Sequence, residues 1–203
     1  MSQIALPLSR GLPTDPASIV LGEANAHVAE ALANPGRWPF GTAILFGPPR
    51  SGKSLFARWF AASGKGTAID RAASLDETEL FHRWNRAQES GEPLLLVADR
   101  EGWDIALPDL ASRLGAALHL RIGPPDDAMV GALIESHAAR LGLALGDGAI
   151  TYLVPRTARD FAGIERLVET IDRLTLERKA PATLGIWRDA LDAVQGPEQA
   201  RLL

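Results

Sequence analysis

The sequence contains no cysteine among its 203 residues, and it has only two methionines and one tyrosine. The lack of cysteine excludes disulfide bonds and thiolate metal sites, and it suits the reducing cytosol. No stretch approaches 18 uninterrupted apolar residues, and no basic segment precedes an apolar one near the first residue. The sequence therefore predicts a soluble, cytoplasmic protein with no membrane partner.

The chain also lacks an excess of positive charge. It carries 21 Lys and Arg against 25 Asp and Glu, a formal net charge of −4. Non-specific attraction to the phosphates of nucleic acid is therefore not expected. The hydrophobic fraction of 46% and the charged fraction of 23% are those of an ordinary globular protein with one sizeable core.

One segment has a specific chemical meaning. It fits the phosphate-binding pattern G-x-x-x-x-G-K-[ST], and a short apolar stretch precedes it while a helical pattern follows. In this pattern the glycines let backbone N–H groups point at a phosphate, Lys53 reaches the β- and γ-phosphates, and the Ser54 hydroxyl can hold Mg²⁺. A glycine turn between strand and helix does not explain Lys53 and Ser54 together, so we expect nucleotide binding. The residues of the segment are Gly47, Pro48, Pro49, Arg50, Ser51, Gly52, Lys53 and Ser54.

Strands and helices alternate up to about residue 123, and only helices follow. Strands are expected at 42–46, 66–70, 94–98 and 117–122, and helices of the second part at 126–141, 147–154, 160–178 and 184–194. Alternation of this kind predicts an α/β core with a mainly parallel sheet. Ser74 and Glu77 form a capping box that predicts the start of a helix. We expect an extended tail over 1–16, an α/β core over 17–123 and a helical lid over 124–203.

Four further segments resemble the AAA+ proteins of the bacterial replication-initiator group. They read IVLGEAN at 19–25, LFHRWNR at 80–86, LLLVADR at 94–100 and LPDLASRL at 107–114. The resemblance implies a P-loop AAA+ core, a small helical lid and bound ADP or ATP with Mg²⁺. This family normally places another strand and helix where only residues 63–66 stand here, so the sheet is expected to be one edge strand short.

The resemblance also implies roles for single residues. Asp70 would be the Walker B acid that holds Mg²⁺ together with Ser54, Asp99 would be sensor I, and Val20 would contact the nucleotide. Asp99 also follows an apolar strand and is therefore the rival candidate for the Walker B acid. Arg71 stands where an active family member usually has a second acid, which predicts poor hydrolysis by the chain itself.

Two arginines are candidates for phosphate contacts. Arg113 matches the arginine finger, which reaches the nucleotide of a neighbouring subunit; the alternative from its position alone is a surface ion pair with Asp109. Glu165 stands where the family has its sensor II arginine. Arg166, the next residue and about 100° further around the helix, is the sensor II candidate.

The first residues resemble a peptide that binds the DNA polymerase sliding clamp (its β subunit). The segment is Gln3, Ile4, Ala5, Leu6, Pro7 and Leu8, a glutamine followed by apolar anchors. Taken alone, such a segment could instead be an added strand or a disordered end. The two tryptophans in loop segments, Trp38 and Trp103, are expected to face a partner. The histidines show no metal-ligand spacing.

Together these features favour a regulatory protein that is held on the clamp and stimulates hydrolysis of ATP bound to the initiator DnaA. No sequence-specific DNA binding of its own is expected, because no helix-turn-helix segment follows the lid. The alternatives are an autonomous AAA+ ATPase, such as a helicase loader or a remodelling factor, and a small-molecule P-loop kinase. The sequence leaves open whether ADP or ATP is resident and whether the chain forms a homodimer.

Overall fold

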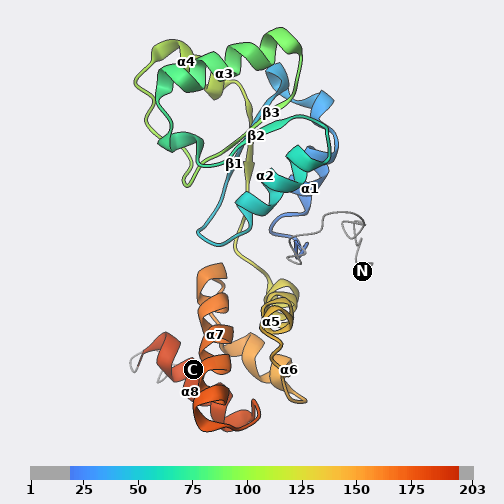
Figure 1. The fold of residues 1–203 in the computed structure, drawn as a ribbon, viewed down its shortest axis with the longest axis vertical. Helices are drawn as coiled ribbons and strands as arrows, with labels where there is room; N and C mark the ends of the chain where they lie inside the picture. The colour runs from blue at the N-terminus through green and yellow to red at the C-terminus, as the bar shows by residue number, and fades with distance from the viewer. Residues whose placement is uncertain (1–18, 197–203) are drawn as a thin grey trace. The chain divides into compact units, whose positions relative to one another are not determined.

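The computed structural model describes residues 19–196. They divide into two compact units, residues 24–123 and residues 124–196 together with residues 19–23 (Figure 1). The predicted tail over 1–16 lies outside the described residues. So do all the predicted clamp-binding residues, Gln3, Ile4, Leu6, Pro7 and Leu8.

A parallel sheet forms the centre of the first unit. Its strands are β1 (Thr42–Phe46), β2 (Thr67–Ile69), β3 (Leu94–Val97) and β4 (Leu118–Arg121), in the order β2-β3-β1-β4. All three pairings are parallel, which confirms the sheet predicted from alternating strands and helices. Within residues 19–196 the sheet has four strands and none lies beyond β2, which agrees with the expected lack of one edge strand.

Helices cover both faces of this sheet. They are α1 (Ala26–Ala33), α2 (Lys53–Ala62), α3 (Glu77–Ser90) and α4 (Pro108–Gly115), with short 3-10 turns η1 (Pro35–Arg37), η2 (Pro39–Gly41) and η3 (Ala72–Ser74). Ile44 and Phe46 of β1 belong to one apolar cluster with α3 and α4. Because side chains alternate along a strand, Ala43 and Leu45 face the other layer, where Figure 1 shows α1 and α2. Helices on both faces explain why β1 and β3 are buried along their whole length.

The start of α3 differs from the predicted capping box. Asp76 is the N-cap, and its carboxylate accepts hydrogen bonds from the backbone N–H groups of Thr78 (3.0 Å) and Glu79 (3.1 Å). The Ser74 hydroxyl instead donates to a carbonyl within the preceding turn. Asp76 caps as well as serine does and lies next to the first helical residue, so the prediction from Ser74 was wrong.

Glu77 makes contacts that the predicted capping box does not include. Its carboxylate accepts hydrogen bonds from the backbone N–H groups of Ala106 (2.9 Å) and Leu107 (2.7 Å). Leu107 is the N-cap residue of α4. Glu77 therefore ties the start of α4 to the first turn of α3.

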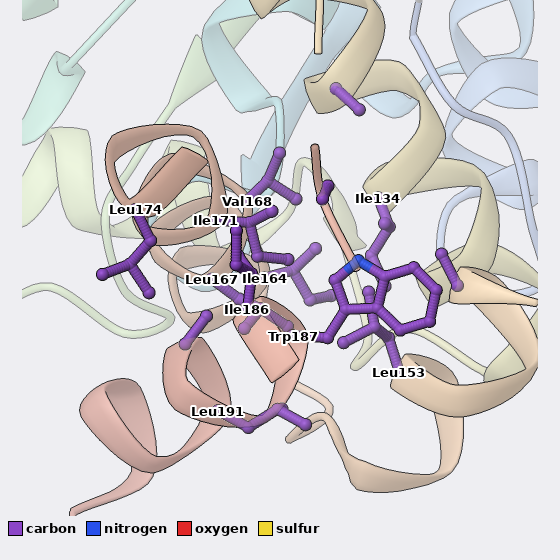
Figure 2. Close-up of a cluster of buried hydrophobic side chains, with 14 of the residues drawn as sticks. Ile134, Leu153, Ile164, Leu167, Val168, Ile171, Leu174, Ile186, Trp187 and Leu191 are labelled. Atoms are coloured by element: carbon purple, nitrogen blue, oxygen red, sulfur yellow. The ribbon is translucent and has the colours of Figure 1, made fainter. Parts of the chain in front are cut away.

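The second unit is helical, as predicted, apart from one isolated parallel bridge between Leu145 and Ala182. It contains α5 (Asp127–Leu141), α6 (Ala149–Leu153), η4 (Val154–Arg156), α7 (Phe161–Arg178) and α8 (Leu184–Gln195). Figure 2 shows that α7 supplies one continuous apolar stripe to the core, Ile164, Leu167, Val168 and Ile171. Helical spacing puts these four on one face, against Ile134 of α5, Leu153 of α6 and Trp187 of α8. None of the helices in residues 19–196 is both long enough and apolar enough to cross a membrane.

Trp38 is part of the core of the first unit, so the prediction that it faces a partner was wrong, whereas Trp103 is half-buried and its contact with a partner stays a prediction. Trp38 is 5% exposed. Its ring stacks on Phe60 at 5.1 Å between centroids, and its Nε1 donates to the Ala31 carbonyl at 3.0 Å. Trp103 packs against the apolar cluster between the sheet and α3. Its position in a loop of the sequence did not prevent the Trp38 ring from being buried.

Gly66→Ala is expected to destabilise the first unit. A Cβ there would lie 2.2 Å from the Pro93 carbonyl oxygen and 2.8 Å from a ring carbon of Phe60. That carbonyl accepts the Thr67 N–H at 2.9 Å, so the backbone cannot retreat without loosening the start of β2. We expect a loss of about 1–3 kcal/mol in chemical denaturation. Gly36→Ala, where a Cβ meets nothing within 4 Å, is the matched control; equal stability of the two variants would contradict this account.

Candidate nucleotide site

The predicted phosphate loop and both predicted acids meet at one edge of the sheet. Residues 47–52 connect β1 to α2. Asp70 is the first residue after β2, and Asp99 is the second residue after β3. The registers Ile69 with Leu96 and Leu45 with Val97 bring the carboxyl ends of these strands to the same level. This is the edge at which ligands bind in open parallel sheets.

The glycines of the loop are required by its geometry. Gly52 has a φ of +89° and is the N-cap of α2, a backbone conformation that disfavours other residues. At Gly47 a Cβ would lie 2.9 Å from the Ser51 hydroxyl oxygen and 3.0 Å from the Ile122 Cβ. At its start the loop therefore packs closely against Ser51 and Ile122, and at its end it turns sharply into α2.

Lys53 spans the loop from the first turn of α2. Its Nζ donates to the carbonyl oxygens of Gly47 (2.8 Å) and Pro48 (3.0 Å), and the residue is only 9% exposed. Burial lowers the pKa of Lys53 from its ordinary 10.5, while the nearby carboxylates of Asp99 and, more weakly, Asp70 raise it. The loop thus contains a poorly hydrated cation that neutral carbonyls hold in place.

The donors of this loop fit a phosphate group. The Ser51 hydroxyl is buried and has no hydrogen-bond partner. Leaving a buried hydroxyl without a hydrogen bond costs folding free energy. Helix geometry leaves the first N–H groups of α2 without intrahelical acceptors, and the helix dipole adds partial positive charge there. An anion with several acceptor oxygens would satisfy the hydroxyl, the N–H groups and Lys53 together.

Mg²⁺ also fits the residues that the sequence predicted for it. The Ser54 hydroxyl and the Asp70 carboxylate are exposed oxygen ligands of the type this ion prefers. Residues 19–196 contain no group of three or more His, Asp or Glu side chains that could hold a metal. Mg²⁺ at nucleotide sites is usually held by one or two protein oxygens, with phosphates and water completing the shell.

The turn after Asp70 is held in an unusual conformation. Arg71 has a φ of +52°, which is uncommon for any residue but glycine. Its N–H donates to the Asp70 carboxylate at 3.0 Å, and its carbonyl accepts from the Ser74 N–H (2.9 Å) and hydroxyl (2.8 Å). Three hydrogen bonds therefore fix the backbone of Arg71, an exposed arginine at the position where active members of the family have a second acid.

Arg113 lies in the last turn of α4 and is held by α3. Its Nη1 donates to the Asn85 side-chain oxygen, and its Cζ lies 4.5 Å from the centre of the Trp84 ring and 4.7 Å from that of Phe81. Among the described residues Arg113 forms no ion pair, so the alternative of a pair with Asp109 was wrong. An amide and two aromatic rings orient a guanidinium without cancelling its charge.

These contacts of Arg113 with α3 were not predicted from the sequence, although the sequence contains a signal for them. Phe81, Trp84 and Asn85 have the spacing i, i+3, i+4, which puts them on one face of a helix. Nothing in the sequence says that this face meets the end of α4, because that contact depends on how the two helices lie on the sheet.

Arg113 is at the opposite end of the sheet from its own phosphate loop. Trp84, which stacks on Arg113, donates from Nε1 to the Thr42 hydroxyl (3.1 Å) at the first residue of β1. The loop begins only after the last residue of β1, roughly 16 Å further along at about 3.3 Å per residue. Figure 1 likewise shows the loop between β1 and α2 far from α3 and α4. Arg113 is therefore remote from the phosphate loop of its own chain.

The remaining predicted residues lie in the helical unit. Arg166 is exposed on α7, with its guanidinium 3.8 Å from the Asp160 carboxylate. Glu165 is buried and lies 3.5 Å from Arg140 of α5, so the residue at the expected sensor II position joins two helices of this unit. Val20 belongs to the same unit. The roles of Val20 and Arg166 at a nucleotide stay predictions.

The pKa of Lys53, followed by NMR of its side-chain carbon next to Nζ, is expected below 10.5 because burial disfavours the ammonium. Asp99→Asn should lower it further, and Asp70→Asn should lower it by less. The unfolded chain then holds this proton more tightly, so the contribution of Lys53 to stability rises as pH approaches 10.5. Glu79→Gln, which breaks an exposed pair with Arg83, is the control. No change in either Asp variant would contradict the electrostatic assignment.

No family model matches the sequence. Among solved structures, domain III of the Thermotoga maritima replication initiation protein DnaA matches with a TM-score of 0.71 and 15% identity, over 88% of this chain and 95% of that one. The FIGL-1 AAA domain in complex with ADP matches with a TM-score of 0.62 and 16% identity, over 88% and 84%. DnaA bound to AMPPCP and single-stranded DNA matches with a TM-score of 0.58 and 19% identity, over 79% and 66%. The chain therefore has a DnaA-like AAA+ fold, an α/β phosphate-loop core with a helical C-terminal unit.

Proposed function

We propose that the chain is a nucleotide-bound regulatory AAA+ protein that binds the DNA polymerase sliding clamp and stimulates hydrolysis of ATP bound to DnaA, which prevents re-initiation of chromosome replication. The observation that carries the proposal is the position of Arg113. Its guanidinium is oriented by neutral groups and lies away from the chain's own phosphate loop. The proposed activity is that of Hda, a short DnaA homologue that the sequence resembles.

In this proposal the resident nucleotide is ADP or ATP. Residues 47–54 hold its phosphates, with Lys53 as the cationic contact, and Ser54 and Asp70 supply oxygens to Mg²⁺. When bound, the metal would neutralise phosphate charge. Asp99, at the sensor I position, and the candidates Val20 and Arg166 would complete the contacts.

We infer that hydrolysis by the chain itself is weak. Arg71 occupies the position at which active relatives use a second acid to orient water, and its backbone is fixed by Asp70 and Ser74. A guanidinium cannot accept a proton from water at neutral pH. The resident nucleotide would therefore serve mainly to order the fold.

Arg113 would act on the nucleotide of the partner. A guanidinium placed against the phosphoryl group stabilises the charge that develops during transfer, which accelerates hydrolysis by about 10³–10⁵. Asn85 takes up one of the five N–H donors of the guanidinium. The charge and the remaining donors stay available for phosphate oxygens.

The clamp contact is assigned to the first residues of the chain. An extended segment could present the Gln3 amide for hydrogen bonding, with Ile4, Leu6 and Leu8 as apolar anchors and Pro7 limiting the conformations of the free peptide. Binding of this kind would concentrate the protein where DNA-loaded clamps are present.

A second candidate function is an autonomous AAA+ ATPase, such as a helicase loader or a remodelling factor. The observation that favours it is the meeting of Lys53 with both carboxylates, Asp70 and Asp99, at one sheet edge. Turnover of ATP by the isolated chain separates the two functions. The regulatory protein is expected to hydrolyse little ATP alone and to accelerate only the hydrolysis of ATP that is bound to DnaA.

Arg113→Ala is expected to reduce hydrolysis of DnaA-bound ATP by about 10³-fold or more in an assay reconstituted with DNA-loaded clamp. The reason is loss of the charge that stabilises the transferring phosphoryl group. Arg83→Ala is the control, because Arg83 is an exposed arginine that pairs with Glu79 on α3. Undiminished hydrolysis by Arg113→Ala, with binding to DnaA intact, would disprove the role of the arginine.

Gln3→Ala is expected to weaken binding to the isolated sliding clamp by tenfold or more, about 1.4 kcal/mol. The amide would be lost from a contact that the apolar anchors alone cannot replace. Ser9→Ala, just beyond the segment, serves as the control, and surface plasmon resonance on immobilised clamp gives both affinities. If the Gln3 variant binds as tightly as the Ser9 variant, the first residues are not the tether.

A further inference from the structure

A strained turn precedes β1. Phe40 has a φ of +50° and Gly41 has a φ of +56°, so two successive residues are left-handed. Glycine takes this conformation easily, but for a bulky residue such as phenylalanine it is an outlier. The Phe40 side chain is nevertheless 61% exposed. Packing within the described unit therefore does not explain why a large aromatic residue stands at this position.

The backbone of this turn is held firmly on both sides. The Phe40 carbonyl accepts hydrogen bonds from the Gln88 amide (2.7 Å) and from the Thr42 hydroxyl (2.9 Å). The Gly41 N–H donates to the carbonyl of Trp38 (3.1 Å), whose ring is buried in the core. Strained residues persist where the surroundings fix them, and such residues cluster at functional sites. The turn therefore fixes the backbone from which an exposed ring projects.

The same contacts connect Phe40 to Arg113. The Thr42 hydroxyl that donates to the Phe40 carbonyl accepts the Trp84 Nε1–H at 3.1 Å, and the Trp84 ring lies 4.5 Å from the guanidinium carbon of Arg113. The residues of α3 that make these contacts share one stripe of the helix. They are Phe81, Trp84, Asn85 and Gln88.

We propose that Phe40 is an aromatic anchor of the surface on which the partner AAA+ domain docks, the domain whose bound ATP receives Arg113. This inference rests on the proposed function and extends it by naming where the partner binds. Phe40 is linked to Arg113 through Thr42 and Trp84 alone, by two hydrogen bonds and one contact of the guanidinium with a ring. One partner buries roughly 800 Å² in a standard interface, which is about 20–30 residues. Aromatic residues, phenylalanine among them, are enriched in the buried centre of such interfaces.

The two residues have different parts in this surface. Arg113 carries a charge that its amide and aromatic neighbours leave uncancelled, which is complementary to an anion such as a triphosphate on the partner. Phe40 supplies apolar area on a fixed backbone, so no backbone conformational entropy is lost when the partner covers it. Phe40 therefore contributes to affinity, and Arg113 to the rate of the bound complex.

Phe40→Gly and Phe40→Asn test this division. Both residues accept a left-handed backbone, so the turn keeps its conformation while the ring is removed. We expect at least tenfold weaker binding of ATP-bound DnaA to the full chain on DNA-loaded clamp, with the maximal rate of hydrolysis unchanged. The melting temperature should stay the same or rise, because strain is relieved. Arg113→Ala should show the opposite pattern, a lost rate with affinity largely kept.

Leu176→Ser is the matched control, since Leu176 is 70% exposed and lies on α7 of the helical unit; it should leave both affinity and rate unchanged. Unchanged affinity in the two Phe40 variants would overturn the inference. A lowered melting temperature with lost affinity would also overturn it, because Phe40 would then be structural. So would loss of self-association, measured by sedimentation, with DnaA affinity intact. The binding measurement needs no hydrolysis, so a failure of the Arg113 role is seen separately.

Discussion

Parallel pairing of β3 with both β1 and β2 is the constraint on which the candidate site depends. It brings three chain segments, far apart in the sequence, to the same edge of the sheet with their carboxyl ends level. Lys53 thereby comes under the influence of Asp70 and Asp99. The helices that bury both faces of the sheet fix this arrangement, because backbone pairing alone would leave β1 and β3 exposed to water.

Helix α3 runs from the carboxyl edge of the sheet, where β2 ends, back to the opposite edge, where β3 begins. Glu77, in its first turn, holds the start of α4, and Phe81, Trp84 and Asn85 hold Arg113 in the last turn of the same helix. Gln88, one turn further along, holds the Phe40 carbonyl. A single helix thus orients both groups, Arg113 and Phe40, that we assign to contact with the partner's AAA+ domain. The nucleotide edge and the partner edge share the sheet but use different helices.

Features with a local cause could be predicted from the sequence, and features with a distant cause could not. The phosphate loop, the parallel strands and the helical second unit follow from glycine spacing, apolar runs and periodicity, which act within a few residues. Other features depend on which surfaces meet after folding. They are the cap at Asp76, the burial of Trp38 and the contacts of Arg113 with α3. The left-handed Phe40 could not be foreseen either, because the hydrogen bond that fixes it comes from Gln88, 48 residues away.

The absence of a fifth strand within residues 19–196 makes β2 an edge strand, and β2 has only three residues, Thr67–Ile69. An exposed edge is a template on which another chain can add a strand, and long, flat edges promote aggregation. Three residues offer too few free N–H and C=O groups for a stable intermolecular ladder. The strand that leads to Asp70 can therefore lie at the margin of the sheet without turning the protein into a seed for cross-β assembly.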